Sequence, residues 1–304
     1  MKTLDSLIRK ASSSTRIPIV AVAAAADRWV LEAVSKAIAE EMASFILFDD
    51  EEQIHALLKR EFPHLLATEK VEIHHSVDAT EAAVQSVKAV SVGQAHVVMK
   101  GNLATSIILR AVLNSEYGLR TGKILSHVAA FEVPDYNRLL FITDAAINIA
   151  PDLEEKAQII RNAIAAAHAC GVQKPLVAPL AAVETINPAM VSTTDAASLF
   201  MMNKRGQITG CLVDGPLALD NAVSIQAAEQ KGITGDAAGK ADILLVPDIE
   251  AGNILYKSLM YFANAKVGSI IQGAKAPIVL TSRADSAETK VYSLALAILA
   301  SQQI

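Results

Sequence analysis

Two hydroxyl residues and an arginine, Thr281-Ser282-Arg283, follow the apolar run 277–280 near the end of the chain. The run has the length of a short buried strand, and the residues after it predict a helix that begins at about residue 284. A helix N-terminus carries unpaired N–H groups and a partial positive charge, which attract anions. With two hydroxyls and a guanidinium beside it, the segment predicts a binding site for phosphate or an oxyanion. The alternative is a plain helix cap made by Ser282 or Asp285, with Glu288 completing a capping box.

A second polar segment follows the apolar run 96–99, where the chain turns at a glycine and starts a helix predicted over residues 103–113. It carries Lys100, Asn102 and Thr105. The carboxyl ends of parallel strands are where α/β proteins place their ligand sites. The glycine spacing of a Walker loop is missing, so the segment is not a nucleotide P-loop. We therefore expect these three side chains to bind substrate.

Further polar side chains are candidates for substrate binding. Arg110 and Arg120 supply cations soon after the second segment. Asp214 opens a Gly-Pro turn and could orient an arginine or a ligand hydroxyl. Asn253 and Lys257 share one face of a helix predicted over residues 252–263, because they are four residues apart. Each has an ordinary alternative as a solvated surface charge, a helix cap or a turn residue.

The elements that must position these residues alternate along the chain. Apolar runs predict strands at 18–24, 45–48, 71–74, 96–99, 138–142, 175–179, 210–213, 243–246 and 277–280. Amphipathic stretches predict helices at 27–42, 50–62, 78–91, 103–113, 152–169, 188–204, 221–231 and 252–263. Asp27, Asp50, Asp78 and Asp152 are the expected N-caps. This alternation predicts an α/β fold with a parallel or mixed sheet, and residues 117–133 an irregular or β-rich connection.

The length of 304 residues favours two domains. We expect the chain to cross between them near residues 131–137 and the last helix to return to the first domain. The predicted first domain is discontinuous, with residues 1–134 and 280–304, and the second domain comprises residues 135–279. The cleft between the two domains is then the default place for a ligand.

Composition restricts the class of protein. The 52% of hydrophobic residues exclude a disordered chain, and the net charge of −5 argues against a general nucleic-acid binder. The apolar stretch 17–26 is too short to span a membrane, and no signal peptide precedes it, so we expect a cytoplasmic protein without a membrane partner. Cys170 and Cys211 are then expected to be free, buried thiols. The apolar content favours a homo-oligomer with an apolar interface.

Several motifs are missing from the sequence. The histidines and cysteines show neither HExxH-type nor CxxC spacing, so a metal site is not expected. There is no GxSxG motif for a serine nucleophile, and no GxGxxG follows the first strand. The sequence therefore predicts no tightly bound cofactor.

Eight segments, taken together and in order, resemble the phosphate acetyl/butyryltransferase family, and its butyryl members most. One such segment would be weak, but the ordered set is specific and runs across about two thirds of the chain. The segments are residues 99–102, 109–112, 118–123, 140–146, 214–220, 238–242, 247–253 and 281–285.

The resemblance implies a reaction and a fold. The reaction is the reversible transfer of a short-chain acyl group between CoA and inorganic phosphate, so that butyryl-CoA and phosphate give butyryl phosphate and CoA. CoA would be a substrate, and transfer would be direct within a ternary complex. The implied fold is the two-domain α/β fold of isocitrate and isopropylmalate dehydrogenases, with the active site in the interdomain cleft.

The resemblance also implies roles for residues. The family's functional Ser-Arg pair corresponds to Ser282 and Arg283, where Arg283 would hold phosphate and Ser282 would assist it or the thioester oxygen. Arg110 is the best match for an earlier functional arginine. A gapless match places Thr289 where acetyl members have an aspartate thought to act as the base, so the nearby Asp285 is the candidate catalytic carboxylate.

Three other functions stay open. The acyl group could be acetyl, which would make the chain a phosphate acetyltransferase. An NAD(P)- and metal-dependent oxidoreductase on the related dehydrogenase fold would need a carboxylate cluster, which Asp242, Asp248 and Glu250 might supply. A catalytically silent regulator that binds CoA or phosphate is the third.

Overall fold

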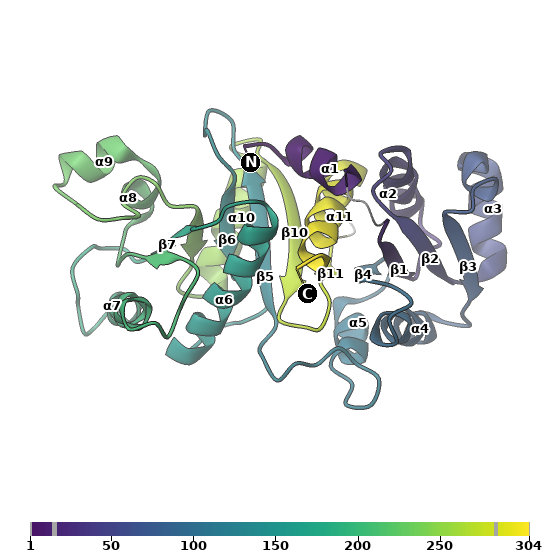
Figure 1. Cartoon of the computed structure of the whole chain (residues 1–304), viewed down its shortest axis with the longest axis horizontal. Coiled ribbons are helices and arrows are strands. Elements are labelled where there is room, and N and C mark those ends of the chain that lie inside the picture. The colour runs from purple at the N-terminus through teal and green to yellow at the C-terminus, as the bar shows by residue number, and fades with distance from the viewer. Residues whose placement is uncertain (1, 14–16, 283–284, 304) are drawn as a thin grey trace. The chain divides into compact units, whose positions relative to one another are not determined.

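The computed structural model describes residues 2–13, 17–282 and 285–303 (Figure 1). The chain divides into two compact units. The first unit comprises Leu4–Lys123 and the chain from Gly268 onward, and the second unit comprises Ile124–Val267. The sequence predicts these limits at 134/135 and 279/280 instead. Strand pairing accounts for the difference, because β5 (Ser126–Glu132) pairs with β6 (Leu140–Thr143), and β11 (Ile278–Val279) pairs with β4 (Val97–Lys100).

The first unit is built around parallel strands in the order β3-β2-β1-β4-β11. The strands not yet given are β1 (Ile19–Ala23), β2 (Ser44–Asp49), β3 (Val71–His75) and β10 (Lys266–Gln272), which is antiparallel to β11. The helices are α1 (Leu4–Ser12), α2 (Arg28–Ala39), α3 (Glu51–Glu61), α4 (Ala79–Ser91), α5 (Thr105–Val112) and α11 (Ala287–Ser301), with a 3₁₀ turn at Pro63–Leu66. Strand β4 is buried at every position, which is why it reads in the sequence as a continuous apolar run.

The second unit has the strand order β5-β6-β9-β7-β8, in which β6, β9, β7 and β8 are parallel and β5 is antiparallel to β6. The remaining strands are β7 (Leu176–Pro179), β8 (Leu212–Val213) and β9 (Ile243–Leu245). The helices are α6 (Leu153–Ala169), α7 (Val191–Lys204), α8 (Leu219–Val223), α9 (Ile225–Gln230) and α10 (Ile249–Tyr261). Both units therefore confirm the predicted α/β fold with a mixed sheet.

Helix starts follow the predicted caps in most places. The carboxylates of Asp27, Asp50, Asp78 and Asp152 each accept a backbone N–H from the first turn of their helix. The prediction for the last helix was wrong. Helix α11 begins at Ala287 and its cap is Ser286, whose hydroxyl accepts the N–H of Thr289 at 3.1 Å. Neither Ser282 nor Asp285 caps it.

Two other elements differ from the prediction. The helix predicted over 221–231 is two short helices, because Ser224 is extended and caps α9. Strands β5 and β10 were not assigned as strands, although β5 lies inside the stretch expected to be irregular or β-rich. Strand β10 contains Gly268, where a Cβ atom would lie 2.7 Å from the backbone of Tyr292 in α11. This close approach requires a glycine, and glycine has poor strand propensity, so the sequence pattern did not indicate this strand.

Helix α11 is the central helix of the first unit. Nearly all of its residues are buried, and it packs against α1 and α2 (Figure 1). Burial inside the first unit therefore accounts for the long apolar sequence of α11, and a membrane is not needed to explain it. None of the helices in the described part of the chain combines the length and apolarity needed to cross a bilayer.

Candidate active site

A small cavity lies where three neighbouring parallel strands of the first unit, β1, β4 and β11, end. The cavity is lined by Asp27, Val30, Gly101, Asn102, Thr281, Ser282 and Lys290. Two segments that are far apart in sequence thus meet here, one after β4 and the other after β11. This juxtaposition follows from the parallel pairing of the two strands, because the carboxyl ends of parallel strands share one edge of the sheet.

The hydroxyl of Thr281 is the most informative group in this cavity. Thr281 is 3% exposed, and its Oγ1 has no hydrogen-bond partner among the described residues. A buried hydroxyl without a partner costs about 1–3 kcal/mol, so such groups usually serve a ligand or a bound water. An anion oxygen in the cavity would satisfy it.

Ser282 and Asp285 are joined by two hydrogen bonds next to Thr281. The N–H of Ser282 donates to Oδ2 of Asp285 at 2.7 Å, and the N–H of Asp285 donates to the carbonyl of Ser282 at 3.1 Å. Ser282 is exposed and lines the cavity. Arg283, the predicted phosphate ligand, lies outside the described residues. Thr289 is buried, and its hydroxyl accepts from that of Ser286 at 3.2 Å.

The turn after β4 depends on a glycine and a buried lysine. At Gly101 a Cβ atom would overlap the carbonyl of Ala24 and lie 2.7 Å from the carbonyl of Ala23, so only glycine allows β4 to end this close to β1. Lys100 is 5% exposed, and its Nζ donates to the carbonyls of Gly101 and Leu103, both at 3.1 Å. Its ammonium therefore stabilises the turn that presents Asn102.

The other predicted ligands of the first unit do not line this cavity. Thr105 is exposed in the first turn of α5, and Arg110 is exposed on the same helix. Arg120 is exposed in the segment that follows α5. The cavity lining thus includes Asn102, Thr281 and Ser282, and it does not include Thr105, Arg110 or Arg120.

The remaining predicted ligands belong to the second unit. The Oδ2 atom of Asp214 accepts the N–H of Ala237 at 2.9 Å, and Gly235 packs directly against the same carboxylate. Asp214 therefore organises a neighbouring loop. Asn253 and Lys257 are both exposed on α10, and the amide of Asn253 donates to the carbonyl of Ala145 at 3.4 Å.

Two charged residues that line the cavity were not among the predicted site residues. Asp27 was expected only as a cap, and it does accept the N–H of Val30 at 3.1 Å. Lys290 is 3% exposed, and burial lowers the pKa of its ammonium, while the charges of Asp285 and Asp27 act in the opposite direction. Lys290 is the only charged residue between positions 289 and 300, and this was the signal that could have revealed it.

The carboxylate cluster that a metal-dependent oxidoreductase would need is not formed. Asp242 lies before β9 and pairs with Arg138 at 3.6 Å, whereas Asp248 and Glu250 lie beyond the other end of that strand. The hypothesis that these three carboxylates bind one metal ion was therefore wrong. The described residues include no group of three His, Cys, Asp or Glu side chains placed to hold a metal ion.

Both cysteines are buried thiols outside any disulfide, as predicted. Burial raises the pKa of the Cys211 thiol to about 11, so this sulfur stays protonated near neutral pH. A protonated thiol is a poor nucleophile, and the geometry gives Cys211 no role in covalent catalysis.

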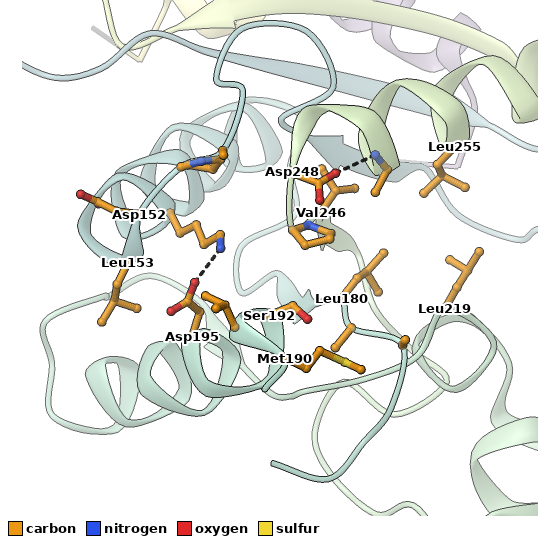
Figure 2. Close-up of a pocket in the computed structure, with 18 residues that line it drawn as sticks. Asp152, Leu153, Leu180, Met190, Ser192, Asp195, Leu219, Val246, Asp248 and Leu255 are labelled. Carbon is orange, nitrogen blue, oxygen red and sulfur yellow. Dashed lines mark hydrogen bonds and ion pairs between the residues drawn. The ribbon is translucent and has the colours of Figure 1, made fainter. Parts of the chain in front are cut away.

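A larger cavity, of about 930 Å³, lies in the second unit at the ends of β7 and β9. Figure 2 shows its mainly apolar lining, which includes Leu180, Met190 and Leu255. At one side, the ammonium of Lys156 contacts the carboxylate of Asp195 at 2.6 Å.

Known proteins resemble this chain along nearly its whole length. It is 56% identical over 300 residues to a Bacillus subtilis protein named "Probable phosphate butyryltransferase", covering 99% of this chain and 98% of that protein. A branched-chain phosphotransacylase from Enterococcus faecalis superposes with a TM-score of 0.82 at 37% identity, covering 94% and 99% of the two chains.

The dehydrogenase relationship of the fold is also confirmed. A structure described as a putative 4-hydroxythreonine-4-phosphate dehydrogenase from Salmonella typhimurium superposes with a TM-score of 0.58 at 14% identity, over 94% of this chain and 99% of that one. At this identity the likeness concerns the fold alone. Residues 66–298, in contrast, match the sequence pattern of the family described as Phosphate acetyl/butaryl transferase. The chain therefore belongs to the phosphate acetyl/butyryltransferase family.

Proposed function

We propose that this protein transfers a butyryl group reversibly between CoA and inorganic phosphate. The observation that carries the proposal is the unpartnered, buried hydroxyl of Thr281 in a cavity that Ser282 and Asn102 also line. Hydroxyl and amide groups at a strand end suit an oxyanion such as phosphate. Family membership supplies the acyl-transfer chemistry.

The reaction needs two anionic substrates to meet. A phosphate oxygen attacks the thioester carbonyl carbon, a C–O bond forms, the C–S bond breaks, and CoA leaves as a thiolate that takes up one proton. In the proposal, Thr281 and Arg283 hold the phosphate, and Ser282 assists the phosphate or the thioester oxygen. Holding both substrates next to each other supplies much of the rate enhancement, because the reaction then occurs within one complex.

The proposal gives the proton transfer to Asp285. Its Oδ2 accepts the N–H of Ser282, which leaves Oδ1 for the proton of the phosphate. The proton then passes to the leaving thiolate. A carboxylate in this role must lie within hydrogen-bond reach of the phosphate. The bond between Asp285 and Ser282, which lines the cavity, supports this part of the proposal.

The proposal also covers acyl length, compartment and assembly. The names of the two relatives refer to butyryl and branched-chain acyl groups, both larger than acetyl. We therefore favour butyryl over acetyl, with CoA as a substrate and no tightly bound cofactor. A cytoplasmic location and a homo-oligomeric assembly complete the proposal, as the sequence predicts.

Phosphate-dependent release of free CoA from acyl-CoA tests this function. We expect release from butyryl-CoA that requires phosphate, and a kcat/KM that is highest at four carbons in a series from two to six. One methylene changes binding by about 1–3 kcal/mol, so the series separates acetyl from butyryl clearly. A maximum at two carbons would make the protein an acetyltransferase. No phosphate-dependent release from any member would overturn the proposal.

A further inference from the structure

Lys290 is a buried cation whose ammonium donates hydrogen bonds to the backbone carbonyls of Ser282 and Asp285. Its Nζ donates to the carbonyl of Asp285 at 2.6 Å and to the carbonyl of Ser282 at 3.4 Å. A buried ammonium is costly unless its protons are hydrogen-bonded. These two bonds, with the nearby carboxylates of Asp285 and Asp27, compensate for the burial.

Ser282 and Asp285 are also held by a second set of bonds. The carboxylate of Asp285 accepts the N–H of Ser282, and the carbonyl of Ser282 accepts the N–H of Asp285. Through its two bonds, Lys290 connects Ser282 and Asp285, which are already hydrogen-bonded to each other, to the buried helix α11. Ser282 lines the cavity, and so does Thr281, which directly precedes it in the chain, so we expect the position of their polar groups to depend on the Lys290 ammonium.

Lys290 also lines the cavity itself. An ammonium has three N–H donors, and two of them are used on the carbonyls of Ser282 and Asp285. Its charge therefore lies at the edge of the space that an anion would occupy. An uncharged side chain of similar length, such as methionine, would fill the same volume without making these two hydrogen bonds.

We propose that Lys290 is a positioning residue for acyl transfer to phosphate, acting through its two backbone bonds on the orientation of Thr281 and Ser282. This inference rests on the proposed function. A merely structural role would show in stability, whereas a positioning role must show in the phosphate step. Removing the ammonium also leaves the carbonyls of Ser282 and Asp285 without this donor, which lowers stability, so the phosphate kinetics and not the unfolding midpoint separate the two roles.

The experiment compares Lys290→Met and Lys290→Arg with the wild-type protein, and uses Lys36→Met on the exposed face of α2 as the matched control. For Lys290→Met we expect kcat/KM for phosphate to fall at least about 30-fold, while the KM for butyryl-CoA changes less than about threefold. Lys290→Arg keeps a cation and should recover part of the loss. Lys36→Met should match the wild type.

A pH profile supplies a readout that packing alone would not change. Burial lowers the pKa of Lys290, and Asp27 and Asp285 oppose this shift. The wild type should therefore lose activity on the alkaline side, beginning below the usual lysine range. The Arg variant should lack this decline, because guanidinium stays protonated there. Identical alkaline limbs in both proteins would overturn the proposal.

Hydrogen exchange tests the positioning without any use of activity. The N–H groups of Ser282 and Asp285 each donate a hydrogen bond to the other residue, so we expect peptides that cover them to exchange faster in Lys290→Met and at the wild-type rate in Lys36→Met. Unchanged exchange in Lys290→Met would overturn the positioning role. A wild-type protein without phosphate-dependent CoA release would overturn the proposed function instead, and the exchange result would still decide whether Lys290 holds these two residues.

Discussion

Ser282 and Asp285 bind each other through two hydrogen bonds, at 2.7 Å from the Ser282 N–H to the carboxylate and at 3.1 Å from the Asp285 N–H to the carbonyl. The carboxylate that we propose as the base therefore also holds the N–H of Ser282. A substitution of Asp285 has to separate its role as the base from its role in holding the Ser282 N–H. Asparagine keeps an oxygen acceptor for the Ser282 N–H but cannot take up a proton at neutral pH.

The first prediction concerns Asp285→Asn. We expect kcat to fall at least about 100-fold, the typical contribution of a general base, while the KM for phosphate changes less than about threefold. Steady-state kinetics with varied phosphate at saturating butyryl-CoA measure both constants. Asp285→Ala, which also loses the acceptor, should raise the KM for phosphate in addition. A kcat near that of wild type in Asp285→Asn would remove Asp285 from proton transfer and leave it only the bond to Ser282.

The second prediction concerns the hydroxyl of Thr281, which finds no hydrogen-bond partner in the described part of the chain. Thr281→Val removes this hydroxyl at nearly constant volume. Without phosphate, the variant should be as stable as the wild type or more stable, because a buried polar group without a partner is lost. The KM for phosphate should rise about tenfold or more, since a hydrogen bond to a charged group contributes about 1.5–3 kcal/mol.

Thr281→Ser keeps the hydroxyl and is the control, with a KM for phosphate near the wild-type value. Thermal unfolding with and without phosphate provides a second measurement, because a ligand that binds the folded state raises its midpoint. An equal phosphate-induced shift in Thr281→Val and in the wild type would show that the hydroxyl does not contact phosphate.

The third prediction concerns Arg283, which follows Ser282 in the sequence. Arg283→Gln should lower kcat/KM for phosphate by about 100-fold, since a charge-assisted, bidentate contact is lost. Arg283→Lys should recover little of this, because an ammonium cannot make the two parallel bonds of a guanidinium. The same kinetic assay decides the question, and Arg60→Gln, on the surface of α3, is the control. Unchanged phosphate kinetics in Arg283→Gln would exclude Arg283 from the site.

Sequence patterns predicted the strands that carry the candidate site. The strands that end at Lys100 and before Thr281 read as apolar runs because they are buried, and parallel pairing then brings Asn102 and Ser282 to one edge. The predicted start of α11 was wrong because Ser282, Asp285 and Ser286 are all residue types that can cap a helix. Only the structure shows that Asp285 binds the Ser282 N–H, which leaves Ser286 to cap.

Other parts of the site could not be predicted from one sequence. Lys290 stands in an apolar helix, and a pattern cannot tell that its ammonium reaches back to the carbonyl of Asp285. Strand β10 contains Gly268 and Ser269, which lower its strand propensity, and its glycine is required by the contact with Tyr292. Arg110 and Arg120 do not line this cavity, and sequence proximity to a strand end does not fix the direction of a side chain. Their predicted role in substrate binding stays a prediction.

The fourth prediction concerns the fit of β4 against β1. Gly101→Ala introduces a Cβ atom that overlaps the backbone of Ala24, so the free energy of unfolding should fall by about 2–4 kcal/mol, beyond an ordinary overpacking cost. Denaturant unfolding measures it. Gly122→Ala is the matched control, because its Cβ meets nothing within 4 Å and only the positive φ of +81° opposes it. We expect about 1 kcal/mol there. Equal losses in both variants would contradict the steric explanation.

The fifth prediction concerns Cys211, and it bears on the thiol-release assay itself. Burial raises the pKa of this thiol to about 11, so at pH 8 roughly one molecule in a thousand carries the reactive thiolate. Because the pKa of this thiol in the folded protein lies above that of a free thiol, the thiolate is suppressed below about pH 11 and forms only as the pH rises through that value. In the native protein at pH 8, we therefore expect a thiol reagent such as DTNB to modify Cys211 far more slowly than it modifies released CoA.

Unfolding the protein in guanidinium chloride should expose both cysteines and release two equivalents of the reagent's chromophore at once. Cys211→Ser should leave acyl transfer unchanged, because a buried, protonated sulfur takes no part in a direct transfer between phosphate and the thioester. A stoichiometric, rapid reaction of the native wild-type protein that disappears in Cys211→Ser would show that the thiol is accessible and ionised, and a matching loss of acyl transfer would require a covalent step through this sulfur.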